Sequence, residues 1–269
     1  MYYTQSFIGV IVLWCLSCSH GASSKHASQA KRPLGDDQSV FNLDSLVNKE
    51  SLDTIPIRFD CVTKKINKRY LGVATKTLFS KLIQGHKIDT THHEVIFLCK
   101  DGYSASVPFY QLLKDRGFVV VRDVDAKLQW DAAINDQYSP CYLVWDLLQD
   151  DHNHSFPYGI THIHIVNSKD EYANAFPTHA SLDVFKGFSI FKNNCIKCHA
   201  INQVGGEVGP ELNIPMNVTE YWKNEQLQKF ILHPSRFRIN SKMPTLTGLT
   251  TKDSRLIVEY LKFMAKNKK

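Results

Sequence analysis

The sequence lacks the motifs that identify most classes of enzyme. Its 269 residues contain no nucleophile elbow, no glycine-rich phosphate-binding loop and no paired carboxylates in a context that indicates a reaction. No segment resembles a nucleic-acid recognition motif, so we expect no nucleic-acid partner. Charged residues make up only 22% of the chain, and there are four methionines and seven cysteines. The positions of these sulfur-containing residues are therefore the most informative feature of the sequence.

The apolar run at the start of the chain, Phe7–Leu16, is too short to span a bilayer as a helix. Its length and the small and polar residues after it are typical of a signal peptide, although no Lys or Arg precedes it. We therefore expect a signal peptide over residues 1–22 and a flexible linker over residues 23–41. Cleavage after Gly21 is one alternative; the other is a lipoprotein signal, in which Cys18 would carry a lipid anchor.

Cys195, Cys198 and His199 form a C-x-x-C-H motif. Two thiols at this spacing can each add across a vinyl group of haem, and the adjacent histidine can ligate the iron. A zinc site would need two further ligands nearby, and neither a second C-x-x-C nor an H-x-x-x-H follows. A redox dithiol would follow a strand, whereas Val184 and Phe188 repeat at helical spacing. The motif predicts one covalent haem c, which also requires an exported chain because haem is attached outside the cytoplasm.

The second axial ligand of the iron is expected to be Met243, which lies 44 residues after the motif histidine. Pro244 follows it and favours an extended loop that can hold a thioether over the haem. Met216 lies close behind the motif, and Met264 falls on the apolar face of the last helix, where methionine usually fills the core. His233 is the other candidate by ligand chemistry.

From Asp183 to the end, about 85 residues resemble the class I cytochrome c family. The resemblance depends on the motif, on Gly187-x-x-x-Phe191 in a first helix, on a last helix over Thr251–Lys266 and on Gly209-Pro210-x-Leu212. It implies that the glycine lets the two helices cross closely. It also implies that the proline carbonyl accepts a hydrogen bond from the motif histidine, which fixes the histidine tautomer. The haem-binding residues implied together are Cys195, Cys198, His199, Pro210, Leu212 and Met243.

The net charge of +6 is unevenly distributed. From Asp183 onward there are 14 Lys or Arg against 7 Asp or Glu, which leaves 18 against 19 before it. This excess is either a solvated face, partly offset by the haem propionates, or a surface that steers the protein toward an acidic redox partner.

Residues 42–170 predict a mixed α+β domain. The pattern predicts a helix over Thr77–Ile83, a hairpin of Val95–Cys99 and Tyr103–Val107 around Gly102, a helix after Pro108, and strands over Phe118–Val121, Cys141–Leu147 and Gly159–Val166. Cys61, Cys99 and Cys141 remain after the leader and motif cysteines are assigned. We expect Cys99 and Cys141 to be buried free thiols. The alternative is a disulfide between two of the three cysteines.

The order of these elements is similar to the molybdopterin-binding domain of the sulfite oxidase family. The matching segments are Tyr70-Leu71-Gly72-Val73, Asp101-Gly102-Tyr103-Ser104, the Pro140–Trp145 strand and Pro157-Tyr158-Gly159-Ile160. That family binds molybdenum through one cysteine, and its arginines clamp the substrate oxyanion and the cofactor phosphate. Here only Cys61 stands at a plausible distance, and no arginine cluster surrounds it in the sequence. We therefore expect a related scaffold without molybdopterin.

His162 and His164 alternate with Ile163 and Ile165, and His152 and His154 lie just upstream. The two imidazoles share one face of a strand, which would suit a zinc or copper site. The alternative that we favour has the isoleucines toward the core and the histidines toward solvent.

The sequence thus predicts a two-domain fold, an α+β sulfite-oxidase-like domain over residues 42–170 and an all-α class I cytochrome c domain over residues 183–269, joined by a linker over residues 171–182. We expect an exported, periplasmic electron carrier rather than a catalyst, with the front domain as a docking or scaffold module. The alternatives are a fused molybdopterin-dependent oxidoreductase and a haem-based ligand sensor in which Met243 is displaced.

Overall fold

The computed structural model describes residues 40–86, 88–130, 135–149 and 154–269. The predicted signal peptide, the lipid anchor at Cys18, almost all of the predicted linker and His152 lie outside these residues. Within the described part, no helix is both long enough and apolar enough to span a membrane. The described residues all belong to one compact unit. We call residues 40–167 the sheet part and residues 168–269 the helical part.

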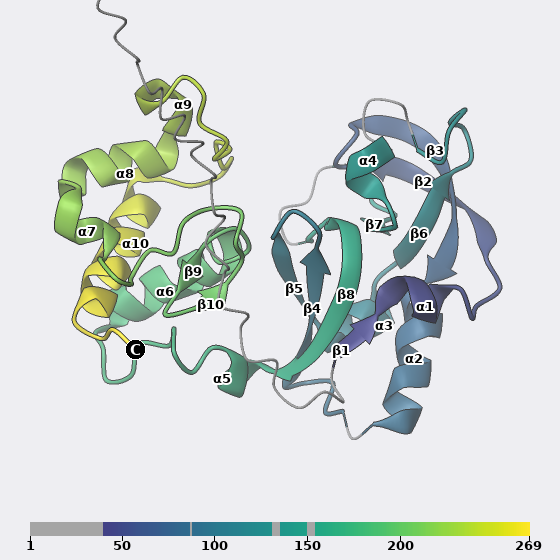
Figure 1. Cartoon of the computed structure of the whole chain (residues 1–269), viewed down its shortest axis with the longest axis horizontal. Coiled ribbons are helices and arrows are strands. Elements are labelled where there is room, and N and C mark those ends of the chain that lie inside the picture. Colours follow the sequence, from purple (N-terminus) through teal and green to yellow (C-terminus); the bar gives the residue numbers. More distant parts are fainter. Residues whose placement is uncertain (1–39, 87, 131–134, 150–153) are drawn as a thin grey trace, which may run out of the picture. The chain divides into compact units, whose positions relative to one another are not determined.

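In the described residues of the sheet part, eight strands form one antiparallel sheet (Figure 1). The order is β2-β3-β6-β7-β8-β4-β5, and β1 pairs with β8. The strands are β1 Val40–Asn42, β2 Asp53–Asp60, β3 Lys65–Ala74, β4 His93–Cys99, β5 Ser104–Pro108, β6 Gly117–Asp123, β7 Cys141–Trp145 and β8 Tyr158–Asn167. The helices are α1 Leu43–Val47, α2 Thr75–Gly85, α3 Phe109–Lys114 and α4 Asn135–Tyr138.

Alternating apolar residues form the core of the sheet part. Ile163 and Ile165 of β8 are buried with residues of α1, α2 and α3, whereas His162 is exposed and His164 is half-buried. The predicted direction of the isoleucines is thus confirmed.

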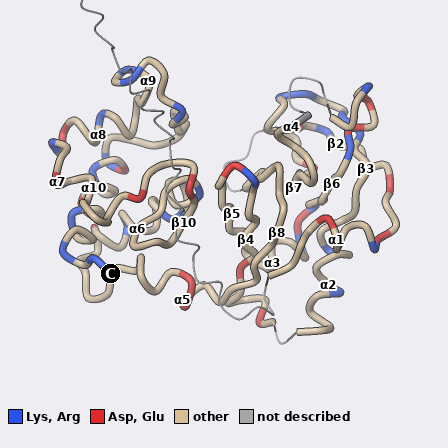
Figure 2. Tube along the Cα trace, viewed as in Figure 1, with Lys and Arg blue, Asp and Glu red and all other residues tan. Residues whose placement is uncertain are grey.

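The predicted hairpin is also confirmed: β4 pairs with β5, and Gly102 in the turn has a φ of 89°, which favours glycine. The edge strand β2 carries charges of both signs and a proline, which discourage pairing with another chain (Figure 2).

A second buried cluster lies around the carboxylate of Asp60. The hydroxyls of Tyr70 and Tyr142 donate to it, and so do the backbone N–H groups of Val62 and Thr63. Asp60 is fully buried, so these four donors compensate for the loss of its hydration. The cluster fastens the turn between β2 and β3 to β7.

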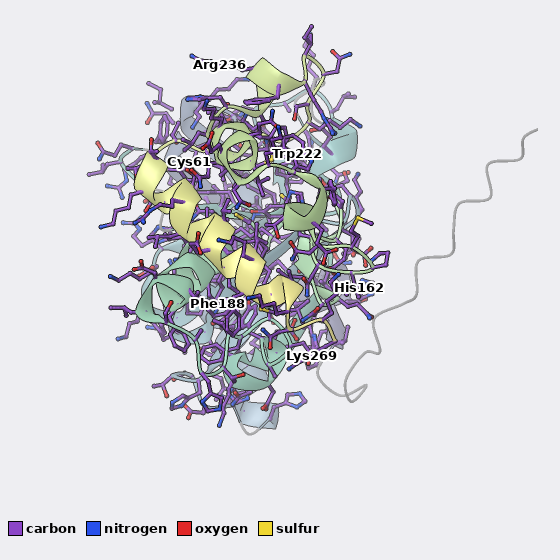
Figure 3. The ribbon with its side chains drawn as sticks, turned by 90° about the vertical axis from the view of Figure 1, so that its left-hand side faces the viewer. Cys61, His162, Phe188, Trp222, Arg236 and Lys269 are labelled. Atoms are coloured by element: carbon purple, nitrogen blue, oxygen red, sulfur yellow. The ribbon has the colours of Figure 1, made fainter. Side chains whose placement is uncertain are left out.

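The helical part is built around a crossing of two helices (Figure 3). Its elements are α5 Ser168–Glu171, α6 Leu182–Asn194, β9 Ala200–Ile201, β10 Val204–Gly205, α7 Val218–Tyr221, α8 Asn224–Leu232, α9 Pro234–Phe237 and α10 Thr251–Ala265. A Cβ on Gly187 of α6 would lie 2.1 Å from the carbonyl oxygen of Leu256 in α10. Phe188 and Phe191 of the same helix pack against Tyr260 of α10, with ring centroids 5.5 and 5.2 Å away. The close crossing implied by the family resemblance is thus confirmed.

Gly187→Ala should destabilise the protein strongly. The added methyl group meets backbone rather than a flexible side chain, so the helices must separate, and overpacking of this kind costs about 3 kcal/mol. Gly85→Ala is the matched control, because a Cβ there has no atom within 4 Å. Thermal unfolding of both variants checks this: an equal change in the two melting temperatures would contradict the close crossing.

The predicted fold class is wrong. The helical part is not all-α, because β9 and β10 pair as a two-stranded antiparallel sheet directly after the C-x-x-C-H motif. The sheet part is dominated by one large antiparallel sheet rather than by a balanced α+β mixture. The main omission was the β2–β3 hairpin, which carries Ile55 and Ile57 at alternating buried positions.

Glu94 of β4 joins the sheet part to the helical part. Its carboxylate accepts hydrogen bonds from Lys192 of α6 (2.7 Å), from the hydroxyl of Tyr172 (3.2 Å) and from Ser106. The Lys192 ammonium also lies 4.1 Å from the centroid of the Tyr172 ring. Burial raises the pKa of Glu94, but the hydrogen bonds from Lys192 and Ser106 outweigh burial and hold the pKa below its ordinary value.

Because its folded-state pKa is lowered, ionised Glu94 stabilises the protein above its unfolded pKa of about 4.3 and loses this effect as the pH falls through the folded value. Glu94→Gln should therefore lower the free energy of unfolding by about 1.5–3 kcal/mol at pH 7. The difference from the natural chain should shrink below about pH 4. Glu259→Gln, in the more exposed pair with Lys262, is the control and should cost less than about 1 kcal/mol. A difference independent of pH in denaturant titrations would contradict this role of Glu94.

Candidate functional site

The C-x-x-C-H motif lies at the end of α6. Cys195 is the C-cap of the helix, and its carbonyl accepts hydrogen bonds from the backbone N–H groups of Cys198 (3.1 Å) and His199 (2.9 Å). This single turn brings the two thiols and the imidazole together. Burial raises the pKa of Cys195 to about 12 and also raises the pKa of Cys198. Both residues are therefore neutral thiols in the chain as described.

The imidazole of His199 is held by the segment that the family resemblance indicated. Its Nδ1 lies 2.9 Å from the carbonyl oxygen of Pro210. A carbonyl can only accept, so Nδ1 carries the proton and Nε2 has its lone pair available for a metal. Burial lowers the pKa of His199, and the bond to Pro210 partly offsets this. A Cβ on Gly209 would lie 2.3 Å from the ring, so only glycine fits beside this histidine.

Backbone hydrogen bonds hold the loop after the motif in close contact with it. Gly206 donates to the carbonyl of Ile196 and Gly209 to that of Cys198, both at 2.7 Å. A Cβ on Gly206 would lie 2.1 Å from the carbonyl oxygen of Lys197. Leu212 packs against the core of the helical part. The glycines of this loop were not predicted as site residues, although their spacing after the motif was a signal in the sequence.

Three buried asparagines, also not predicted, support this loop. The amide of Asn217 donates to Asn213 (2.7 Å), and the amide of Asn213 donates to Asn202 (2.6 Å). Asn217 also donates to the carbonyl of Leu261 in α10, and Asn202 to that of Asn174. The network joins the loop to the last helix and to the segment before α6. Polar residues at such separations carry no periodic signal.

The candidates for the second axial ligand differ in their surroundings. Met243 is half-buried in the loop between α9 and α10, where its N–H donates to the hydroxyl of Ser241. Met264 is buried in the core of the helical part, as expected for a core-filling residue. Met216 and His233 are both exposed, and His233 forms the C-cap of α8. Met243 is thus the candidate that combines partial burial with a loop position.

These residues fit a covalently attached haem. Two thiols on one turn, an imidazole with its Nδ1 hydrogen-bonded and a methionine on a separate loop form the donor set that haem c requires. Among the residues that the structure describes, no group of three or more His, Cys, Asp or Glu side chains could hold a metal ion. His152, one of the histidines considered for a zinc or copper site, lies outside these residues.

The other cysteines lie apart from this site. Cys99 and Cys141 are buried thiols, and no disulfide is present among the cysteines that the structure describes. Cys61 is also buried, with its sulfur 3.9 Å from the carbonyl oxygen of Gln149. Arg58 and Arg116 both pair with the buried carboxylate of Asp146. They therefore do not form a free arginine clamp beside Cys61.

Residues 183–261 match the family model of cytochrome c oxidase, cbb3-type, subunit III. The segment begins on α6, includes the motif and ends on α10. It is a c-type cytochrome domain. The chain is therefore a haem-containing electron-transfer protein, with haem c as its cofactor. The comparisons with curated proteins and with solved structures gave no match. The family match does not extend to the sheet part, so the resemblance of that part to the sulfite oxidase family is unsupported.

Proposed function

We propose that this chain is an exported electron carrier with one covalent haem c. Cys195 and Cys198 form the thioether bonds, and His199 and Met243 are the axial ligands. The observation that carries the proposal is the hydrogen bond from His199 Nδ1 to Pro210, within a segment that matches a cytochrome family. It leaves Nε2 as the metal-binding nitrogen.

When bound, haem supplies an iron that cycles between two oxidation states. The residues of the chain hold and surround it. The Pro210 carbonyl fixes the tautomer and orientation of His199, and Gly209 leaves room for the ring. Leu212 packs against the apolar core of the helical part. Ligation by His199 and Met243 favours a raised reduction potential and leaves no position for a substrate.

The charge of the cytochrome domain supports an acidic redox partner. Basic residues lie along α8, α9, α10 and the loop after α9 (Figure 2). Several are exposed: Lys223, Lys229, Arg236, Arg238, Lys242 and Lys252. Such a surface speeds encounter with a negatively charged protein, and the effect weakens as the ionic strength rises. In this proposal the sheet part is the docking or scaffold module.

A redox titration with optical detection tests the proposal. We expect a reversible one-electron change of one haem per chain, with no binding of carbon monoxide or nitric oxide by the reduced iron, because both axial positions are filled. Rapid binding of either gas would instead support a haem-based sensor. The rate of electron exchange with an acidic redox protein should fall as salt is added, and exchange with a basic one should not.

A further inference from the structure

The turn of the β4–β5 hairpin is bonded to the haem-attachment loop. The backbone N–H of Ser104 donates to the carbonyl of Lys197, which lies between the two motif cysteines, at 2.9 Å. The backbone N–H of Glu207 donates to the carbonyl of Gly102 at 2.8 Å. One hydrogen bond thus enters the motif itself, and the other enters the glycine-rich loop that folds back on it. The hairpin holds both sides of the attachment loop at once.

Gly102 makes this approach possible. Its φ of 89° is in the region that favours glycine, and a Cβ there would lie 3.2 Å from the backbone carbon of Glu207. Any side chain at this position would therefore be strained by the backbone and crowded by the loop. The turn is closely fitted to the cytochrome domain rather than merely near it.

Tyr103 lies between Gly102 and Ser104, the two hairpin residues that hydrogen-bond to the attachment loop. Its side chain is half-buried. Tyr103 of the sheet part is therefore held next to this loop by the backbone on both sides of it.

The hairpin meets the loop at a half-buried position. The carbonyl of Lys197 accepts the hydrogen bond from Ser104, and Lys197 and the adjacent Cys198 are both half-buried. An isolated cytochrome domain would leave this side of the loop without the hairpin that covers it here. The sheet part thus supplies part of the wall next to one thioether position.

We propose that the β4–β5 hairpin is a positioning element for the haem: it fixes the attachment loop, covers its Cys198 side and thereby raises the reduction potential. This inference rests on the proposed function, since it requires haem at Cys195 and Cys198. Oxidised iron carries one more positive charge than reduced iron, so a wall that excludes water favours the reduced state. The sheet part would then tune the cytochrome as well as serve as a scaffold.

Gly102→Ala and Tyr103→Ala test the proposal in the full-length haem protein. The first variant displaces the turn from the loop, and the second removes the ring between the two hydrogen-bonded residues of the turn without changing the backbone. Gly85→Ala and Tyr110→Ala are the matched controls, because Gly85 has open space around its Cα and Tyr110 is an exposed tyrosine on α3. Haem content, reduction potential and amide hydrogen exchange of residues 195–207 are measured for all four.

We expect unchanged haem content, a lower reduction potential in both test variants, and faster exchange of the loop amides in Gly102→Ala. Neither control should change these quantities. A test variant with full haem content, an unchanged potential and unchanged exchange would overturn the positioning role. If Gly102→Ala does not fold, Tyr103→Ala decides the question by its potential. Absence of haem from the natural chain itself would instead refute the proposed function.

Discussion

Replacing both motif cysteines, in the double variant Cys195→Ala and Cys198→Ala, is expected to abolish covalent haem completely. The thioether bonds would be lost, and the core of the helical part would lose the apolar contacts that a bound haem would add to it. We expect no haem-stained band after denaturing electrophoresis. We also expect loss of helical circular dichroism from α6 and α10, since both contribute to that core.

Cys141→Ala is the control for this experiment. Cys141 is a fully buried thiol in β7 of the sheet part. Cys141→Ala should lower the free energy of unfolding, because it leaves a small cavity, and it should leave haem attachment unchanged. Haem that still migrates with the double variant under denaturing conditions would show that these cysteines are not the attachment points.

Met243→Ala is expected to keep the haem and change its electronic state. Loss of the thioether ligand should remove the weak absorption band near the red end of the oxidised spectrum. The potential should fall by about 0.1 V, a fraction of the roughly 0.8 V range that axial ligands set. Carbon monoxide should then bind the reduced iron, because a coordination position is open.

Met216→Ala provides the comparison, since Met216 is an exposed methionine in the same domain. It should leave the band, the potential and the lack of gas binding unchanged. If the band survives in Met243→Ala and disappears in Met216→Ala or in a His233 variant, the axial assignment must move to that residue.

The cytochrome domain could be predicted from the sequence because its information is local. Cys195, Cys198 and His199 are adjacent in the chain, and the glycine at position 187 lies in the helix that leads to them. The partner helix α10 has a clear apolar stripe with Leu256, Ile257 and Leu261 buried. Periodicity and a short motif were therefore sufficient for the two helices and the haem.

The rest of the fold depends on contacts between distant residues. β2 pairs with β3, and β3 pairs in turn with β6, whose residues lie about fifty positions further along the chain. Asp60 in β2 is a buried polar residue, and two of the four donors to its carboxylate are the distant hydroxyls of Tyr70 and Tyr142. No periodic signal indicates such a cluster, and the hairpin was missed although Ile55 and Ile57 alternate with polar neighbours.

The contacts between the sheet part and the helical part were also beyond prediction. Glu94 and Lys192 are separated by 98 positions. From its own sequence context, each would be predicted to be a charged side chain exposed to solvent. The Asp101-Gly102 turn was predicted from its glycine. Its hydrogen bonds to the loop at Lys197 and Glu207 could not be predicted, because they depend on how the sheet part folds. Long-range pairings of single residues have no sequence signature comparable to that of C-x-x-C-H.

The most direct test of the central claim is to measure haem and molybdenum per polypeptide on one sample. The chain should be produced in a periplasm that has both the haem-attachment and the molybdopterin machinery. We predict one haem that resists acidified-solvent extraction and no molybdenum above background. A haem-free chain, or molybdenum close to one per chain, would contradict the account. Molybdenum binding would make Cys61 the first residue to mutate and sulfite the first substrate to test.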